Sequence, residues 1–400
     1  ILSRVSYFIL MTSVWGIGGF GGQARRIPFH IYCTRLSGFV NVLPKFKKNK
    51  FGKKIKIIAI TLCTVLCIAL GLVSVGDKQT IKVYNAGEYI DTELISIFEE
   101  DYGCSVVYET FDSNESMYTN VMSGEKYDII IPSDYMIERL IKEDFLQEID
   151  HSKLENYYEV IPSLLDKEFD PGNRYSIPYF WGSVGILYDK TVVSEEDLKA
   201  GWEVLRNPKY KDDIYMYDSE RDSFMVALKA LGYSLNTTDT SELDEAYKWL
   251  IEQRDIMNPI YIGDEVIDSM ISGSKAMAFV YSGDAAYIMS ENENMGFYEP
   301  ENGTNIWIDG MVMTKVCTNT DLAHKFIDFM LDPDNAYSNS EAVGYSSSVT
   351  NAFEEIRDNV YIGIDAYVPR QNYPKDEIFK YQEPEIKKYS AELWTKVKAQ

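Results

Sequence analysis

The sequence predicts an α/β fold with a parallel sheet covered by helices on both faces, and three observations point to it. From residue 80 onward, short runs of β-branched and aromatic residues alternate with helical patterns. The composition, 46% hydrophobic and 25% charged, is that of a folded protein with a sizeable core. An apolar segment without charges precedes the alternation, so we also expect an N-terminal hydrophobic helix.

The first part of the alternation repeats a strand–helix unit. Strands are predicted at 81–84, 104–110 and 127–131. Helices are predicted from Asp91, from a capping box formed by Asp112 and Glu115, and at 135–142. The apolar face of the first helix would consist of Leu94, Ile97 and Phe98.

The pattern starts again near residue 185. Further strands are predicted at 185–188, 214–217, 276–281 and 306–316. Further helices are predicted at 197–205, 223–231, 241–252, 266–272 and 322–331. In parallel sheets, ligands bind beyond the carboxyl ends of the strands, and residues 85–89 and 133–135 lie at such ends.

Charge divides the chain into a basic leader and an acidic body. The first 79 residues hold 12 of the 39 Lys and Arg residues but one of the 62 Asp and Glu residues. The rest therefore carries 27 basic and 61 acidic residues, a net charge of −34. A body this acidic repels phosphates, which argues against nucleic acid as a partner and favours cations.

The leader has the features of an export signal. Residues 57–75 form a 19-residue apolar run, and a lysine-rich stretch precedes it. We therefore expect residues 45–76 to be a signal peptide or membrane anchor, which could be cleaved before Asp77, retained, or lipidated at Cys67. Residues 1–44 fit no conventional signal and are expected to be an N-terminal extension.

Sequence motifs of catalysis are missing from the body. It has no nucleotide-binding loop, no zinc-protease motif and no serine-hydrolase motif, so neither a cofactor nor a metal is predicted. Acidic pairs such as Asp212 and Asp213 keep a secreted hydrolase open as an alternative.

Several expected turns combine aromatic residues with carboxylates. They are 88–89, Tyr135, 218–222, 281–284, 307–309 and Tyr345. Aromatic faces attract ammonium groups and pack on methylene chains, while carboxylates neutralise positive charge. The combination predicts a site for an organic cation.

Eight strings, in this order, resemble the polyamine-binding proteins of ABC importers, the spermidine/putrescine receptors. They are VYNAGEYI, YETFDSNESMY, YDIIIPSDYM, IDHSKL, FDPGNRYSIPYFWGSVGI, LGYSLNTTD, IWIDGM and AVGYSSS. The resemblance covers residues 80–400 and implies a two-lobed periplasmic-binding-protein-like fold with crossing hinge segments. Lobe 1 would consist of 80–184 and 309–355, and lobe 2 of 185–308 and 356–400.

The resemblance also implies the ligand contacts. They are Glu88, Tyr89, Ser133, Tyr135, Asp222, Tyr281, Trp307, Asp309 and Tyr345, with Ser219 and Gln382 as weaker candidates. Asp309 would hold an inner ammonium group, and Trp307 and Tyr281 would stack on the carbon chain. Asp222 and Glu88 would meet the terminal amines.

Three places depart from the family pattern. Ala86 and Gly87 stand where some members have Trp and Thr, Ser219 stands where Asp can occur, and Tyr281 replaces a Trp. We expect the third ammonium of spermidine to gain little here, so putrescine should bind at least comparably.

The predicted protein is a polyamine receptor that catalyses nothing. It would bind putrescine or spermidine outside the cytoplasm, in the periplasm or at the outer face of the membrane. By hinge closure it would deliver the ligand, as a monomer, to the membrane permease of an ABC importer. A receptor for another small solute is a further alternative beside the hydrolase.

Overall fold

The computed structural model describes residues 78–399. The predicted extension at 1–44 and the predicted signal or anchor at 45–76 lie outside the described residues, so both stay predictions. Among the helices that the structure describes, none combines the length and the apolar character needed to cross a membrane.

The strands of residues 78–399 form one mixed sheet. They are β1 (Thr80–Ala86), β2 (Ser105–Phe111), β3 (Ile129–Ile130), β4 (Ser176–Asp189), β5 (Ile214–Tyr217), β6 (Ile260–Ile262), β7 (Met277–Tyr281), β8 (Met295–Tyr298), β9 (Ile306–Met313) and β10 (Ser346–Ser347). The order in the sheet is β2-β1-β3-β9-β4-β7-β5-β6, and β8 and β10 pair with β4 outside this path.

The α/β class is confirmed, but the predicted parallel pairing holds for only part of the sheet. β1 is parallel to β2 and β3, and β5 is parallel to β6 and β7. β4 and β9 instead run antiparallel to every strand with which they pair. Strand–helix–strand units lead from β1 to β2 and from β2 to β3, whereas four short 3-10 helices follow α6 before β4 begins.

Twelve α-helices lie in the described part of the chain. They are α4 (Thr92–Tyr102), α5 (Asn114–Met122), α6 (Asp134–Lys142), α7 (Glu195–Leu198), α8 (Glu220–Leu231), α9 (Thr240–Met257), α10 (Val266–Ile271), α11 (Ser282–Glu291), α12 (Thr320–Leu331), α13 (Pro333–Val343), α14 (Thr350–Asn359) and α15 (Pro384–Lys398). The predicted helix at 197–205 is wrong as one element, because α7 ends at Leu198 and a 3-10 helix covers Gly201–Arg206.

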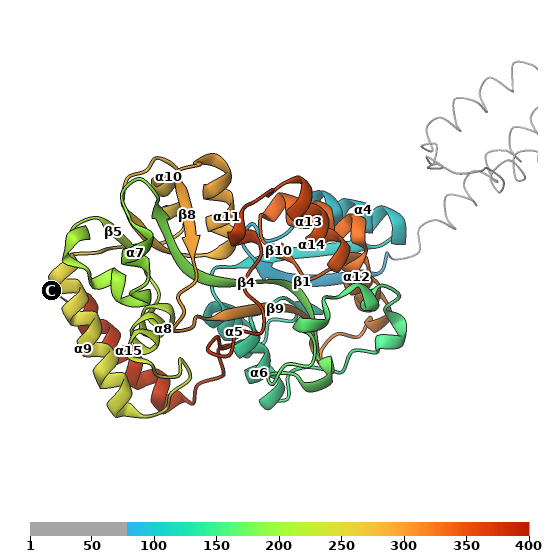
Figure 1. Cartoon of the computed structure of the whole chain (residues 1–400). Helices are drawn as coiled ribbons and strands as arrows, with labels where there is room; N and C mark the ends of the chain where they lie inside the picture. Colours follow the sequence, from blue (N-terminus) through green and yellow to red (C-terminus); the bar gives the residue numbers. More distant parts are fainter. Residues whose placement is uncertain (1–77, 400) are drawn as a thin grey trace, which may run out of the picture. The chain divides into compact units, whose positions relative to one another are not determined.

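β4 connects two groups of elements, which lie side by side in Figure 1. Its first half pairs with β9, and its second half pairs with β7 and β8. The β1 group surrounds the first half and consists of β1, β2, β3, β9, α4, α5, α6, α12, α13 and α14. The β5 group surrounds the second half and consists of β5, β6, β7, β8, α8, α9, α10, α11 and α15. The strand predicted to begin at Gly185 is therefore the middle of a longer strand.

The apolar face of α4 is narrower than predicted. Asp91 caps the helix, as predicted, by accepting a hydrogen bond from the backbone of Glu93. Leu94 and Phe98 are buried, whereas Ile97 is 39% exposed. Ile97 comes three residues after Leu94 and lies at the edge of the buried stripe of the helix.

The predicted capping box of α5 is wrong by one residue. Ser113 and Ser116 form the box, and each hydroxyl accepts a hydrogen bond from the other residue's backbone N–H at 3.1 Å. The carboxylate of Glu115 is therefore not used as a cap and is available to other elements.

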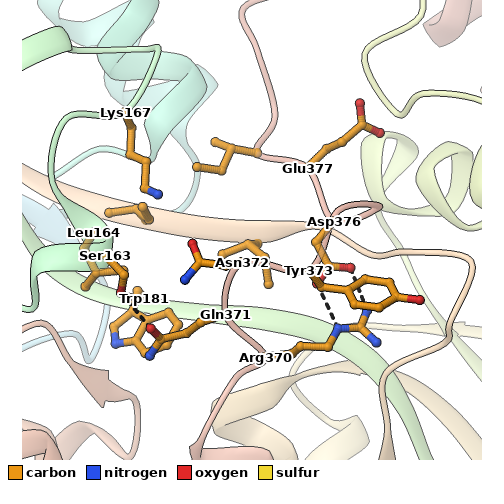
Figure 2. Close-up of a pocket in the computed structure, with 13 residues that line it drawn as sticks. Ser163, Leu164, Lys167, Trp181, Arg370, Gln371, Asn372, Tyr373, Asp376 and Glu377 are labelled. Atoms are coloured by element: carbon orange, nitrogen blue, oxygen red, sulfur yellow. Dashed lines mark hydrogen bonds and ion pairs between the residues drawn. The ribbon is translucent and has the colours of Figure 1, made fainter.

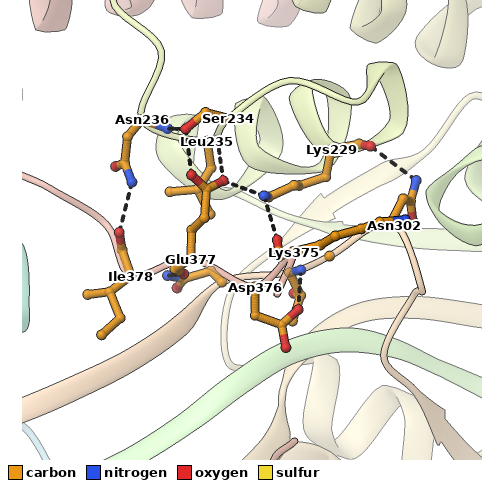
Figure 3. Close-up of polar contacts among 12 residues, drawn as sticks. Lys229, Ser234, Leu235, Asn236, Asn302, Lys375, Asp376, Glu377 and Ile378 are labelled. Carbon is orange, nitrogen blue, oxygen red and sulfur yellow. Dashed lines mark hydrogen bonds and ion pairs between the residues drawn. The ribbon is translucent and has the colours of Figure 1, made fainter. Parts of the chain in front are cut away.

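The segment 368–383, which we call the strap, connects the 3-10 helix Asp365–Tyr367 with α15. Figure 3 shows how Glu377 of the strap contacts Lys229 of α8, a residue that is 4% exposed. Ser234 Oγ donates to the same carboxylate at 2.6 Å, and the backbone N–H of Leu235 donates at 3.1 Å. The strap is thus fixed to the β5 group by an ion pair whose lysine is buried and whose carboxylate is half-buried.

Candidate functional site

A cluster of three carboxylates and a row of aromatic rings forms the candidate site. Its centre is Asp309 on β9, where residues alternate between the two faces of the sheet. Trp307 and Asp309 therefore share one face, and Ile306 and Ile308 share the other. A β-bridge between Ser133 and Asp309 places the start of α6 beside this strand.

Asp309 receives its hydrogen bond from the turn that follows β1. Tyr89 Oη donates to Asp309 Oδ2 at 2.7 Å, and Tyr89 is 8% exposed. Burial raises the pKa of Asp309 to about 6, although the hydrogen bonds from Tyr89 and Ser133 act in the opposite direction. The predicted residues Tyr89, Ser133 and Asp309 thus lie together.

Ser133 is positioned by a residue that the sequence analysis did not single out. Asn114 of α5 donates from Nδ2 to Ser133 Oγ at 3.0 Å and accepts from the backbone N–H of Ser133 at 3.1 Å. Its only signal in the sequence is its place in the string that carries the resemblance.

Asp134 is a second residue that was missed. It is 1% exposed, accepts from the backbone N–H of Ile308 at 3.0 Å and thereby fastens α6 to β9. Burial raises the pKa of Asp134 to about 8, with a further contribution from the charge of Asp309. It faces backbone donors, so we assign it to positioning rather than to ligand contact.

The second carboxylate of the cluster is Asp222, in the first turn of α8. Tyr281 Oη donates to Asp222 Oδ2 at 3.1 Å, and Asp222 is 5% exposed. Burial raises the pKa of Asp222, while Ser219 and Tyr281 lower it through hydrogen bonds. Ser219 is the N-cap of α8, and its hydroxyl accepts a hydrogen bond from the backbone N–H of Asp222 at 3.4 Å. It therefore caps the helix and does not supply the negative charge that an Asp would bring to this position.

The third carboxylate, Asp284, is not among the predicted contacts, although it stands three residues after Tyr281. Tyr345 Oη donates to Asp284 Oδ1 at 2.8 Å. Burial raises the pKa of Asp284 to about 7; the hydrogen bond from Tyr345 lowers it, and the charge of Asp264 raises it. This contact spans 61 residues of sequence, so no local pattern could predict it.

A continuous row of aromatic rings connects the three carboxylates. Ring centroids are 5.3 Å apart for Tyr217 and Tyr281, 6.2 Å for Tyr281 and Trp307, 5.4 Å for Trp307 and Tyr345, and 5.8 Å for Tyr345 and Tyr89. All four pairs meet edge to face, so ring faces remain available to a ligand. A Cβ at Gly182 or Gly283 would collide with Trp307 or Tyr345, so both positions require glycine.

Three predicted contacts are not part of this cluster. Glu88 is exposed, with φ at 51°, and Gln382 is half-buried; neither makes a side-chain hydrogen bond or ion pair within residues 78–399. Tyr135 lies near Glu115, with 3.4 Å between its hydroxyl and each carboxylate oxygen, and the guanidinium of Arg221 covers its ring.

The chemistry of the cluster is that of a site for an organic cation. Asp222, Asp284 and Asp309 take part in none of the ion pairs among the described residues, and a neutral tyrosine hydroxyl donates to each of them. Buried carboxylates with neutral donors gain most from an added positive charge, and ring faces favour ammonium groups. Within residues 78–399, no three His, Cys, Asp or Glu side chains are grouped to hold a metal ion.

A cavity of about 140 Å³ lies apart from this cluster, between the strap and the face of β9 that carries Ile306 and Ile308 (Figure 2). Trp181 of β4 and Lys167 also line it. None of the three cluster carboxylates reaches this cavity, so the cavity and the candidate site are separate features.

The acidic pair considered for hydrolysis has structural roles. Asp212 accepts from Asn258 Nδ2 at 2.8 Å, and Asp213 accepts from the backbone N–H of Ala276 at 3.1 Å. The first contact holds the loop before β5 to the end of α9, and the second holds it to the residue before β7. Neither contact offers support for a hydrolase.

Comparison with known proteins places this architecture in a family. The sequence model described as bacterial extracellular solute-binding protein matches residues 124–361. A second model, described as a hypothetical lipoprotein of the MG045 family, matches residues 47–159. The chain belongs to the family of bacterial extracellular solute-binding proteins.

Relatives with known roles share most of the chain. The spermidine/putrescine-binding periplasmic protein of Salmonella typhimurium is 32% identical over 70% of this chain and 80% of its own length. The putrescine/cadaverine-binding protein of Pseudomonas aeruginosa is 30% identical over 84% of this chain and 98% of its own length. The structure of PotD, a spermidine/putrescine ABC transporter substrate-binding protein from Streptococcus pneumoniae, has a TM-score of 0.71 and 38% identity, over 80% of this chain and 99% of the other.

Proposed function

We propose that the protein binds a linear polyamine, putrescine or spermidine, and delivers it to the membrane permease of an ABC importer. The observation that carries the proposal is the row of aromatic rings joining three carboxylates, Asp222 buried and Asp284 and Asp309 half-buried, that lack a cation from the described chain. The relatives' roles support the same ligand class.

The ligand would lie along the rings of Tyr281, Trp307 and Tyr345. One ammonium group would replace the tyrosine proton as the partner of Asp309, and another would meet Asp222 or Asp284. Glu88 would take part only after a rearrangement of the turn after β1. Tyr135, whose ring is covered by Arg221, would lie at the edge of the site rather than contact the ligand.

The β1 and β5 groups would act as the two lobes, with boundaries at 80–184 and 309–355 for lobe 1 and at 185–308 and 356–400 for lobe 2. β4, β9 and the strap would then be the crossing segments of the hinge. The receptor would work outside the cytoplasm, as a monomer and without catalysis, and residues 45–76 would export or anchor it.

Calorimetric titration with putrescine and spermidine tests the proposal, with butylamine as the ligand that has a single ammonium group. We expect both polyamines to bind, putrescine at least as well as spermidine, and butylamine far more weakly. Heat with neither polyamine would reject the ligand class, and heat with butylamine alone would reject a site for two ammonium groups.

Replacing Asp309 by Asn checks the central residue. Removing one partner of a desolvated charge pair costs about 2–5 kcal/mol, so putrescine affinity should fall by a factor on the order of thirty or more. Asp218→Asn is the matched control, because Asp218 is exposed and pairs with Lys398 outside the cluster. An unchanged affinity in Asp309→Asn would remove Asp309 from the site.

A further inference from the structure

Beyond the ligand cluster, two cations of the β5 group meet two side chains of the β1 group. Lys387 of α15 lies 2.7 Å from Glu115 Oε1 of α5. The guanidinium of Arg221 on α8 lies 3.8 Å from the centroid of the Tyr135 ring on α6. Glu115 and Tyr135 are themselves 3.4 Å apart, so the four side chains form one connected set.

We propose that Glu115, Tyr135, Arg221 and Lys387 form a clasp that holds the two lobes together and positions Tyr135 at the edge of the polyamine site. The proposal rests on the proposed function in one respect, namely that the β1 and β5 groups move as lobes around a ligand. The four residues are positioning residues in this scheme, because none of them needs to touch the ligand.

Arg221 is arranged for stacking rather than for pairing with an acid. No ion pair among residues 78–399 includes it, and its guanidinium lies between the ring of Tyr135 and the ring of Phe379, 4.8 Å away on the strap. Its one hydrogen bond, to the backbone carbonyl of Lys380, is long at 3.5 Å. A flat, weakly hydrated guanidinium suits the space between two aromatic faces, which an ammonium group would fill poorly.

Glu115 has the electrostatic environment that the clasp requires. Burial on its own would raise the pKa of Glu115, but the hydrogen bond and charge of Lys387, together with the charge of Arg221, hold this pKa below its usual value. Because the capping box of α5 uses Ser113 and Ser116, the Glu115 carboxylate is left for these two cations.

The clasp also reduces the electrostatic repulsion between the two lobes when they close. A body with a net charge of −34 contains two acidic lobes that repel each other when they approach. Cations on one lobe that face an acid and an aromatic ring on the other replace part of this repulsion by attraction. Closure would then depend on salt as well as on ligand.

Charge reversal provides the test. Lys387→Glu places two acids opposite each other, and Glu115→Lys places two cations opposite each other, so each variant should open the lobes. In each we expect putrescine to dissociate about three- to tenfold faster, with little change in the association rate. The double variant Glu115→Lys with Lys387→Glu restores the attraction, and its dissociation rate should return to within about twofold of wild type.

Lys388→Glu is the matched control, since Lys388 is the next residue on α15 and faces Glu392 of its own helix at 4.0 Å. It changes the net charge of the protein by the same amount as Lys387→Glu and should leave the dissociation rate unchanged. For Arg221, we expect Arg221→Met to speed dissociation about threefold or more, and Arg221→Lys to recover only part of the loss.

Small-angle scattering of the ligand-free variants separates a failed clasp from a failed ligand assignment. The single reversals should have a larger radius of gyration than wild type, and the double variant should regain the wild-type value. These changes would be measured even if wild type bound no polyamine. Single reversals that match wild type in compactness, or a double variant that restores neither compactness nor dissociation, would overturn the clasp.

Discussion

The protonation of Asp309 and Asp284 links pH to the occupancy of the site. Burial raises the pKa of both carboxyl groups from the ordinary value of 3.8, to about 6 for Asp309 and to about 7 for Asp284. A tyrosine hydroxyl donates to each of them, which stabilises the ionised form only in part. Their charge state therefore changes within the physiological range, unlike that of an exposed aspartate.

Polyamine affinity should fall as the pH is lowered from 8 to 5. Putrescine remains doubly charged over this range and binds the ionised carboxylates, so each proton bound by Asp309 or Asp284 competes with it. Below the pKa of a group, this competition weakens binding by a factor on the order of ten for each pH unit. Titration at pH 5, 6, 7 and 8 measures the slope, and Asp309→Asn should flatten the part near pH 6.

The ligand-free protein should show the opposite trend in stability. The pKa of each group is higher in the folded than in the unfolded protein. The stability that each group contributes is therefore fully present below the unfolded pKa of 3.8. It is lost as the pH rises through the folded pKa, about 6 for Asp309 and about 7 for Asp284. Urea unfolding midpoints compared between pH 5 and pH 8, in wild type and in Asp309→Asn, would measure this contribution. Equal pH dependence in the two proteins would contradict the raised pKa of Asp309.

At the scale of elements, the sequence predicted best those segments in which one pattern dominates. β5 was predicted at its observed bounds, and α6 begins one residue earlier than predicted. α13 was not predicted, because Pro333 stands just after the helix predicted at 322–331 and proline commonly follows the end of a helix. Proline also suits the first turn of a new helix, which is its place in α13. β10 was missed because two residues carry no periodicity, and its place is decided by pairing with β4.

In the predicted site too, residues implied by the family resemblance were predicted, whereas roles that depend on tertiary contacts were not. The family strings contain Tyr89, Trp307, Asp309 and Tyr345, and the wider resemblance implied Asp222 and Tyr281 as well. The fold brings these residues into one cluster. Asp284 was predicted only as the end of an aromatic and acidic turn and not as a ligand contact, and Asn114 was not predicted as part of the site. The roles of both depend on partners reached through tertiary packing. Whether Glu88 reaches a ligand depends on the conformation of the turn after β1.

The anchoring of the strap can be tested at Lys229. In Lys229→Met the half-buried carboxylate of Glu377 loses its cation, which costs about 1–3 kcal/mol of unfolding free energy. Lys375→Met is the matched control, since Lys375 is an exposed strap residue without an ion pair in residues 78–399, and should change the unfolding free energy by about 0.5 kcal/mol or less. Urea unfolding of both variants gives the comparison, and equal losses would mean that the ion pair does not anchor the strap.

At the scale of the whole molecule, the cluster takes its residues from both groups of elements. Tyr89 follows β1, and Asp309 lies on β9 of the same group. Asp222, Tyr281 and Asp284 lie in the β5 group. A ligand that contacts all of them can do so only when the groups are close. Its differential affinity for that arrangement must therefore shift the population towards the closed form.

The expected result is a smaller radius of gyration when putrescine is added to residues 77–400, measured by small-angle scattering. Asp309→Asn supplies the control, because at the same putrescine concentration its weaker binding should leave the protein closer to its ligand-free dimensions. Hydrogen exchange adds a local measurement: amides at the start of α6 in the β1 group and at the start of α8 in the β5 group should become more protected with ligand. If scattering and exchange were identical with and without bound putrescine, closure around the ligand would be wrong, and the two groups would form one rigid body whose site is complete before the ligand arrives.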